Sequence, residues 1–312
     1  MIYTEIGGRC GNQMFLYAVS RCLEEMHGKG ICFNFYQIYE HQKKDKTWKD
    51  DLKEFKVEEY KVESFPKPLV YIHGTVCQKI VWTLCRVLYK LPCQSRAALY
   101  KRQEKIQPFV NRFGIYFMVH GYSPLIESKT KNQFVCGTYE DSRFFNEIRE
   151  KLVKELEPRT EINKNNKELY DLICDSESVC VSFRRGDDFV KGKEKALRDI
   201  CNLKYYYEAI EEVKNRIPNA KFFFFSDDIT WVKENFNCPV ESHFESGTDP
   251  IAEKMRLMSA CKHFIMSNST FCWWAQYLSI NKEKIVVSPD HWFNMSGYQH
   301  QLIEKEWVLI EC

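Results

Sequence analysis

Short apolar runs alternate with amphipathic segments throughout the second half of the chain. Apolar runs that predict β-strands lie at 179–183, 221–225, 263–267 and 284–288. Segments with helical periodicity lie at 204–216, near Thr230, at 250–260 and at 270–279. Strands that alternate with helices are typical of a parallel sheet with right-handed crossovers, as in a Rossmann-like fold. The run Phe222–Phe225 is apolar at every position, which favours a strand buried on both faces of that sheet.

The first 36 residues predict a strand, a glycine turn, a helix and a second strand. The strands are Met1–Ile6 and Ile31–Tyr36, and the turn Gly7–Gly11 leads into a helix from about Asn12 to His27. This order of elements indicates that the chain also begins with an α/β unit.

Two charged stretches mark the organisation of the chain. Residues 40–63 predict solvated loops or short helices, and residues 146–167 predict a connection between two domains. Because a chain of 312 residues usually forms about two domains, we expect domains at 1–160 and 161–312.

Composition and charge exclude some classes of protein. The chain has 28% charged and 44% hydrophobic residues, as an ordinary globular protein does, and its net charge of +2 argues against a dedicated nucleic-acid binder. None of the 14 cysteines forms a Cys-x-x-Cys pair. Cys32, Cys174, Cys180 and Cys272 lie in apolar runs and are expected to be buried thiols. With no signal peptide at Met1, these features favour a reducing, cytoplasmic location.

Residues 69–118 carry an uneven charge. This segment holds eight Lys or Arg and one acidic residue, Glu104, and its middle, Ile80–Leu91, is apolar with Arg86 and Lys90 interspersed. One interpretation is a helix at the inner face of a membrane, which would suit a lipid-linked acceptor. The other is a solvated basic face on a helical insertion.

The hexapeptide Ser182–Asp187 follows a predicted strand directly. Arg184, Arg185 and Asp187 therefore emerge at the carboxyl end of a strand, where open α/β sheets bind ligands. Paired guanidinium groups suit a diphosphate, because each offers planar bidentate donors and a permanent charge. The alternative is a surface arginine pair with a local carboxylate partner.

Two further strands of this half end in polar clusters, Ser226-Asp227-Asp228 and Asn268-Ser269-Thr270. In a parallel sheet these endings share one edge. Asp227 and Asp228 can accept hydrogen bonds from a base or ribose, or form a plain turn. Ser269 and Thr270 begin a helix, whose free amides suit an anion, although a simple helix cap is the alternative.

The glycine turn adds Arg9 and Asn12 at a junction between turn and helix. Its spacing does not match a dinucleotide fingerprint, and an ordinary tight turn with a helix cap explains it equally well. The chain contains neither a P-loop nor an Asp-x-Asp pair. A diphosphate would then be neutralised by arginine and helix-end amides, so we expect no metal and no cofactor.

Four motifs together resemble those of the bacterial α-1,2-fucosyltransferases. They are Gly7-Gly8-Arg9-Cys10-Gly11-Asn12-Gln13-Met14-Phe15, then Ser182-Phe183-Arg184-Arg185-Gly186-Asp187, then Phe225-Ser226-Asp227-Asp228, and finally Asn268 to Trp274. They stand in the family's order over nearly the whole chain, although residues 69–118 match no motif of the family.

The resemblance implies an α/β GT-B-like fold, with two Rossmann-like domains of parallel strands facing a central cleft. It implies inverting, metal-independent transfer of L-fucose from GDP-fucose to the 2-hydroxyl of a galactose-terminated glycan, in surface polysaccharide or O-antigen synthesis. The first domain would then face the acceptor and the second would bind the donor.

The same resemblance assigns roles to single residues. Arg184 and Asn12 would be catalytic. Apart from the resemblance, Asp187 is a candidate catalytic base, and the alternative is a structural partner for the two arginines. Residues expected to bind GDP-fucose are Arg9, Arg184, Arg185, Asp227, Asp228, Asn268, Ser269, Thr270 and Phe271.

Ser182 departs from the family pattern, which has histidine before the arginine pair. If the chain is active, that histidine is not an indispensable base. Two alternatives remain open: a GDP-sugar transferase of different sugar or linkage, and a catalytically weak protein that binds a glycan or a nucleotide sugar.

Overall fold

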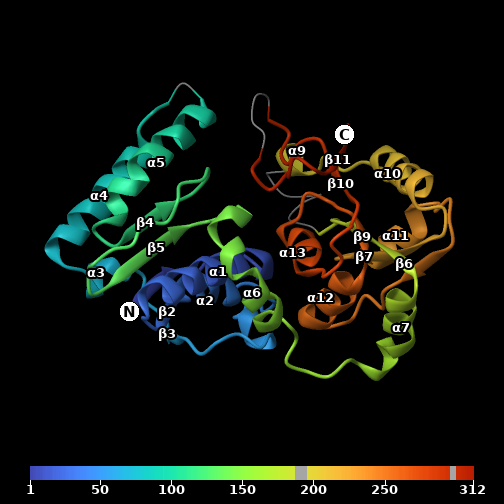
Figure 1. Cartoon of the computed structure of the whole chain (residues 1–312), viewed down its shortest axis with the longest axis horizontal. Coiled ribbons are helices and arrows are strands. Elements are labelled where there is room, and N and C mark those ends of the chain that lie inside the picture. The colour runs from blue at the N-terminus through green and yellow to red at the C-terminus, as the bar shows by residue number, and fades with distance from the viewer. Residues whose placement is uncertain (94, 187–194, 296–299) are drawn as a thin grey trace. The chain divides into compact units, whose positions relative to one another are not determined.

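The computed structural model describes residues 1–93, 95–186, 195–295 and 300–312. The chain divides into two compact units, Met1–Glu155 and Leu156–Cys312, each built around its own parallel β-sheet (Figure 1). The first unit ends at residue 155, whereas the sequence predicted a boundary at residue 160. No described helix combines the length and the apolar character needed to cross a bilayer.

The unit Met1–Glu155 contains a five-stranded sheet in the order β3-β2-β1-β5-β4. Its strands are β1 (Ile2–Glu5), β2 (Ile31–Asn34), β3 (Lys61–Glu63), β4 (Ile115–Met118) and β5 (Gln133–Gly137), all parallel. Its helices are α1 (Cys10–His27), α2 (Tyr36–Gln42), α3 (Val70–His73), α4 (Val76–Lys90), α5 (Arg96–Asn111) and α6 (Arg149–Glu155), with 3₁₀ turns at Asp51–Glu54, Ser142–Phe144 and Asn146–Ile148.

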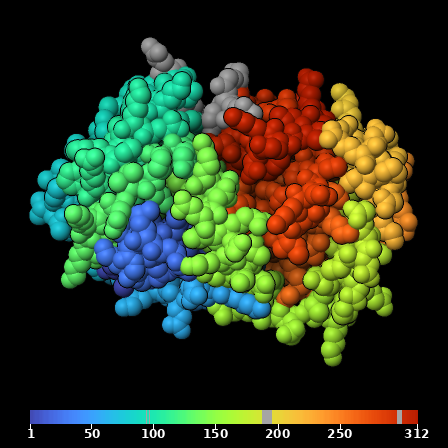
Figure 2. Space-filling view, in the orientation of Figure 1, coloured from blue at the N-terminus to red at the C-terminus, as the bar shows by residue number. Residues whose placement is uncertain are grey.

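Helix α1 is the most deeply buried helix of this unit. Thirteen of its residues, including Met14, Phe15 and Leu23, are buried. Helices α4 and α5 pack against each other and against β4, and Figure 2 shows this part of the chain, in teal, at the molecular surface.

The unit Leu156–Cys312 contains a six-stranded sheet in the order β11-β10-β9-β6-β7-β8. Its strands are β6 (Glu177–Phe183), β7 (Ala220–Ser226), β8 (Ser242–Phe244), β9 (His263–Ile265), β10 (Val286–Pro289) and β11 (Val308–Ile310), all parallel. Its helices are α7 (Lys167–Asp175), α9 (Lys195–Arg198), α10 (Leu203–Arg216), α11 (Ile229–Asn235), α12 (Ile251–Ala260) and α13 (Thr270–Leu278), with a 3₁₀ turn at Lys164–Asn166.

The core of this second unit lies on both faces of its central strands. The four phenylalanines Phe222–Phe225 are each at most 2% exposed, so the prediction of a strand buried on both faces is confirmed. On one face Tyr206 stacks on Phe183, with ring centroids 3.6 Å apart. The strands that carry the polar endings are therefore held in the middle of a packed sheet.

The predicted strands and helices of the second half are confirmed, with ends shifted by a few residues. In the first half, the strand predicted as Ile31–Tyr36 ends at Asn34. The side chain of Asn34 accepts a hydrogen bond from the amide of Tyr36 (3.2 Å), which starts α2 instead. Strands β3, β4, β5, β8 and β11 were not predicted, because runs of three to five residues carry little periodicity.

Two burial predictions need correction. Cys174 is exposed, because its neighbour Ile173 takes the buried position on α7, whereas Cys32, Cys180 and Cys272 are buried as expected. The charged segment 40–63 is only partly solvated, because Leu52 and Phe55 are fully buried and anchor its 3₁₀ turn.

Candidate active site

Three polar strand endings meet at one edge of the second sheet. Strands β9, β6 and β7 are neighbours and parallel, with Val181 opposite Ile265 and Phe183 opposite Ser226. The residues that follow these strands therefore leave the sheet side by side. This edge holds most of the residues expected to bind a nucleotide sugar.

Asp227 holds the loop that carries both arginines. Its carboxylate pairs with the Arg184 guanidinium and accepts the backbone N–H groups of Arg185 (2.6 Å) and Gly186 (2.8 Å). The side chains of Arg184 and Asp227 are each 26% exposed, so the pair is reachable from solvent. Asp227 thus fixes the position of the arginine that we expect to contact a diphosphate.

Arg185 is held by an aromatic ring. Its guanidinium lies over the ring of Trp231, 3.8 Å from the centroid, and 3.7 Å from a carboxylate oxygen of Asp199. The Nε–H of Arg185 is buried and has no hydrogen-bond partner among the described residues. Stacking holds the guanidinium in one plane, so less side-chain entropy of Arg185 is lost when an anion binds.

The other residues expected at this edge have structural partners. Asp228 caps α11 by accepting the amide of Trp231 (3.0 Å), a local structural role in place of the plain turn that was the alternative expected from the sequence. Asn268 is buried and donates to the carbonyls of Arg198 (2.8 Å) and Trp292 (3.0 Å), so it ties the end of α9 and the segment at Trp292 to the end of β9.

Ser269, Thr270 and Phe271 stand at the start of α13 and are partly exposed. Ser269 occupies the N-cap position, yet its side chain makes no capping hydrogen bond. The amide groups of this first helical turn are the kind that bind anions.

Ser182, which replaces the family's histidine, is buried. It is 6% exposed, and its hydroxyl lies 3.3 Å from the hydroxyl of Ser267 beside β9. Asp187, the candidate base, lies outside the described residues.

The structure also reveals supporting residues that sequence reasoning missed. Glu245 is fully buried and accepts the amide of Ser226 (2.7 Å), while Lys254 pairs with Glu245 (3.0 Å) and donates to the Ser226 carbonyl (3.0 Å). Burial raises the pKa of Glu245. This pair fixes the end of β7 and hence the starting point of Asp227. Glu245 follows a three-residue strand that the hydrophobic pattern does not mark.

The glycine turn in the unit Met1–Glu155 positions the remaining expected residues. Gly8 has a φ of +78°, and the side chain of Asn12 packs against it, where any Cβ would lie 2.6 Å from the Asn12 Cβ. Arg9 donates to Thr47 (2.7 Å) and pairs with Asp45 (2.8 Å). The turn is therefore built around a glycine that no other residue replaces without strain.

The sequence profile of Glycosyl transferase family 11 matches residues 1–311. The chain belongs to this family. The family resemblance inferred from the four motifs is thereby confirmed, and the protein is a glycosyltransferase.

Two relatives carry more specific names. An α-1,2-colitosyltransferase of Escherichia coli is 34% identical over 197 residues, which cover 61% of this chain and 67% of the relative. The O-antigen biosynthesis glycosyltransferase WbnK of Escherichia coli is 23% identical over 323 residues, covering 98% of this chain and 99% of the relative.

The fold of this glycosyltransferase is shared with a solved structure. The crystal structure of the NodZ α-1,6-fucosyltransferase soaked with GDP-fucose matches with a TM-score of 0.52 and 14% identity, over 89% of this chain and 91% of NodZ. With two parallel sheets, one in each unit, the expected GT-B-like α/β class is confirmed.

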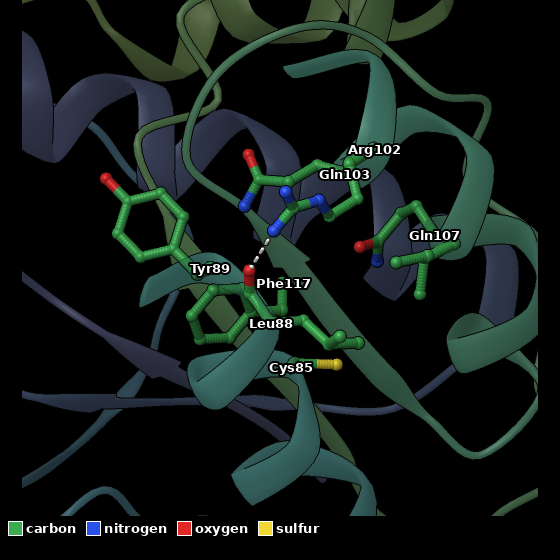
Figure 3. Close-up of a pocket in the computed structure, with 8 residues that line it drawn as sticks. Cys85, Leu88, Tyr89, Arg102, Gln103, Gln107 and Phe117 are labelled. Carbon is green, nitrogen blue, oxygen red and sulfur yellow. Dashed lines mark hydrogen bonds between the residues drawn. The ribbon is translucent and has the colours of Figure 1, made fainter. Parts of the chain in front are cut away.

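A small cavity lies within the unit Met1–Glu155. It measures about 20 Å³ and lies between α4, α5 and β4, lined by residues that include Cys85, Arg102 and Phe117 (Figure 3). This volume holds about one water molecule. The cavity is therefore a packing gap rather than a site for a sugar nucleotide.

Proposed function

We propose that this family 11 glycosyltransferase moves L-fucose from GDP-fucose to the 2-hydroxyl of a galactose-terminated glycan, with inversion. In this proposal the acceptor belongs to an O-antigen or a similar surface polysaccharide. The α-1,2 linkage in the name of one relative and the O-antigen role in the name of the other support this choice.

One observation carries the proposal most directly. Two consecutive arginines stand at the carboxyl edge of the sheet, Arg184 oriented by the Asp227 carboxylate and Arg185 by the Trp231 ring. Such preorganised guanidinium groups suit the two phosphates of a nucleoside diphosphate. We accordingly assign donor binding to the domain 161–312 and acceptor binding to the domain 1–160.

The proposed reaction breaks the bond between the fucose anomeric carbon and the diphosphate oxygen. The electron pair leaves with GDP, and the 2-hydroxyl oxygen of galactose forms the new bond on the opposite face of the sugar. The proton of that hydroxyl passes to a general base, for which Asp187 is the candidate, or to water. Arg184 and Arg185 stabilise the negative charge that develops on GDP. Losing one preorganised group of this kind typically costs ~3 kcal/mol, or roughly 100-fold in rate.

The helix start at Ser269 and Thr270 supplies additional amide donors for the phosphates in this scheme, with Phe271 beside them. Arg9 and Asn12 are proposed to face the donor from the first domain. Because arginines and amides carry the neutralising role, the proposal includes metal-independent turnover. We expect excess EDTA to leave the initial rate unchanged, and strong inhibition would count against this part.

The decisive experiment measures GDP release from GDP-fucose with a galactose-terminated acceptor. We expect Arg184→Ala to lower kcat/KM by roughly 100-fold. Arg216→Ala is the matched control, because Arg216 lies on α10 in an exposed ion pair with Glu212. Full activity of a folded Arg184→Ala protein would refute the assignment. Absence of GDP release by the wild-type enzyme would favour a protein that only binds glycans or nucleotide sugars.

A second donor has support of its own, because the relative with 34% identity is a colitosyltransferase. Colitose is L-fucose without its 3-hydroxyl. A direct competition between GDP-fucose and GDP-colitose, with linkage analysis of the product, separates the two donors. Preference for GDP-colitose would correct the sugar while leaving the role of Arg184 unchanged.

A further inference from the structure

Helix α4 carries an apolar stripe on the face that points away from its core. Gln78, Trp82 and Cys85 are buried, whereas five aliphatic residues are about half exposed or more. They are Val76 (75%), Ile80 (56%), Leu84 (54%), Val87 (50%) and Leu91 (47%). Their spacing of three or four residues places them in one row, about 22 Å long, which runs along α4 and ends at its C-cap residue Leu91. We call this row the α4 stripe.

A row of cations flanks the α4 stripe. Lys79, Arg86 and Lys90 recur at intervals of seven and four residues, which places them together along one side of the stripe. Helix α4 contains no acidic residue. The acidic residue of segment 69–118, Glu104 on α5, accepts the amide of Tyr122 (3.1 Å). This surface is therefore apolar and positively charged.

The helix that carries the stripe is firmly seated. Thr75 and Gln78 form a capping box at its start, and Gln78 also donates to the carbonyls of Phe113 (3.0 Å) and Asn132 (2.9 Å). At its end, Arg102 of α5 donates to the Leu88 carbonyl (2.8 Å), the bond drawn in Figure 3. The stripe is thus presented by a preformed helix rather than by a loose segment.

We infer that the α4 stripe docks this protein onto the surface of an anionic phospholipid bilayer, with α4 lying in the plane of the headgroups. Aliphatic side chains enter the boundary between headgroups and acyl chains, and flanking lysines and arginines contact anionic headgroups. Charge complementarity favours this occupant over a second copy of the chain, because α4 offers no acidic group to pair with its own cations. The inference does not depend on which sugar the enzyme transfers.

The test is vesicle flotation of the full chain, with vesicles of phosphatidylcholine alone or with about a quarter phosphatidylglycerol. We expect the wild-type protein to bind the anionic vesicles at least ~10-fold more tightly, and to lose most of that gain in ~0.5 M NaCl. Ile80→Glu/Leu84→Glu removes apolar insertion, and Arg86→Glu/Lys90→Glu reverses the cations. Each pair should weaken binding at least ~10-fold.

Matched controls lie in the other unit. Ile280 is 81% exposed, and Lys204 is an exposed cation on α10, so Ile280→Glu and Lys204→Glu should leave vesicle binding unchanged. Circular dichroism melting checks that each variant folds. If Ile80→Glu/Leu84→Glu fails to fold, the vesicle binding of Arg86→Glu/Lys90→Glu decides the outcome. No vesicle binding by the wild-type protein would overturn the inference. If the wild-type protein binds no vesicles but self-associates, and Ile80→Glu/Leu84→Glu abolishes that self-association, the α4 stripe is a contact between copies instead.

Discussion

The carboxylate of Asp227 pairs with the guanidinium of Arg184 across two neighbouring strands, β6 and β7. The same carboxylate receives the backbone N–H groups of Arg185 and Gly186. One acidic residue thus fixes both the side chain and the backbone of the loop that carries the proposed diphosphate contact. Asp227 is a positioning residue in this arrangement.

Replacing Asp227 should impair donor use more than it impairs folding. Asp227→Ala removes the acceptor that two backbone amides share with the Arg184 guanidinium, so the arginine loop loses its anchor. We expect kcat/KM for the donor to fall about 10-fold or more, following the ~1 kcal/mol or more contributed by each hydrogen bond to a charged group. Asp227→Asn keeps one acceptor oxygen and should lose less. Asp171→Asn is the control, because Asp171 lies on α7 in an exposed ion pair with Lys167. Equal effects at both positions would contradict the positioning role.

Restoring histidine at position 182 should not improve this enzyme. Ser182 is buried beside Ser267, so an imidazole must displace its neighbours. Overpacking of this kind costs about 1–3 kcal/mol and should lower Tm by several degrees. Ser182→Ala, which removes one hydroxyl, should change Tm little and keep turnover within a few-fold. Higher turnover in Ser182→His at unchanged Tm would show that the base is missing here.

The glycine turn allows a graded test of backbone strain. Gly8→Ala combines a positive φ with a collision against Asn12, so we expect a loss of more than ~2 kcal/mol in the free energy of unfolding and weaker donor binding. Gly28→Ala has the positive φ but open space, and should cost ~1 kcal/mol. Gly30→Ala has neither penalty and should be neutral. Denaturant unfolding of the three variants checks the order, and a neutral Gly8→Ala would exclude the described packing of Asn12.

Glu5, at the carboxyl end of β1, should make stability depend on pH. Burial raises the pKa of Glu5 to about 7, even though its carboxylate accepts the Leu69 amide (2.7 Å) and the Asn34 side chain (2.8 Å). Between about pH 4.5 and 7 the folded state holds a proton that the unfolded state has lost, so the free energy of unfolding falls as the pH rises. The full loss is ~3 kcal/mol and is reached above pH 7.

Glu5→Gln mimics the protonated acid and should remove this fall. Urea unfolding at about pH 5 and about pH 8 measures it, as the difference between the wild-type and variant pH dependences. Glu283→Gln, at an exposed position, is the control and should leave the pH profile unchanged. Buried Asp51, whose pKa burial raises to about 6, contributes a fall of the same sign in both proteins. Parallel profiles for wild-type and Glu5→Gln would exclude Glu5 as the cause.

Much of the second unit follows from local pattern alone. Strands such as β6 and β7 are long apolar runs, and their polar endings must share an edge once the strands are parallel. Short strands such as β3 and β8 are not predicted, because three residues show no hydrophobic period and do not indicate which strand they pair with. The supporting role of Glu245 is missed for the same reason, since its burial depends on the strand that β8 pairs with.

The sequence by itself determined the α/β class, the family motifs and the strand endings where Arg184 and Asp227 stand, because each of these depends on local order along the chain. Only the tertiary structure decided which partner each side chain takes: Asp227 binds the arginine loop, Asp228 caps a helix, and buried Ser182 contacts Ser267. Such choices depend on contacts between residues far apart in the chain. A single sequence carries no direct signal of those contacts, because hydrophobic periodicity reports burial but not the neighbour.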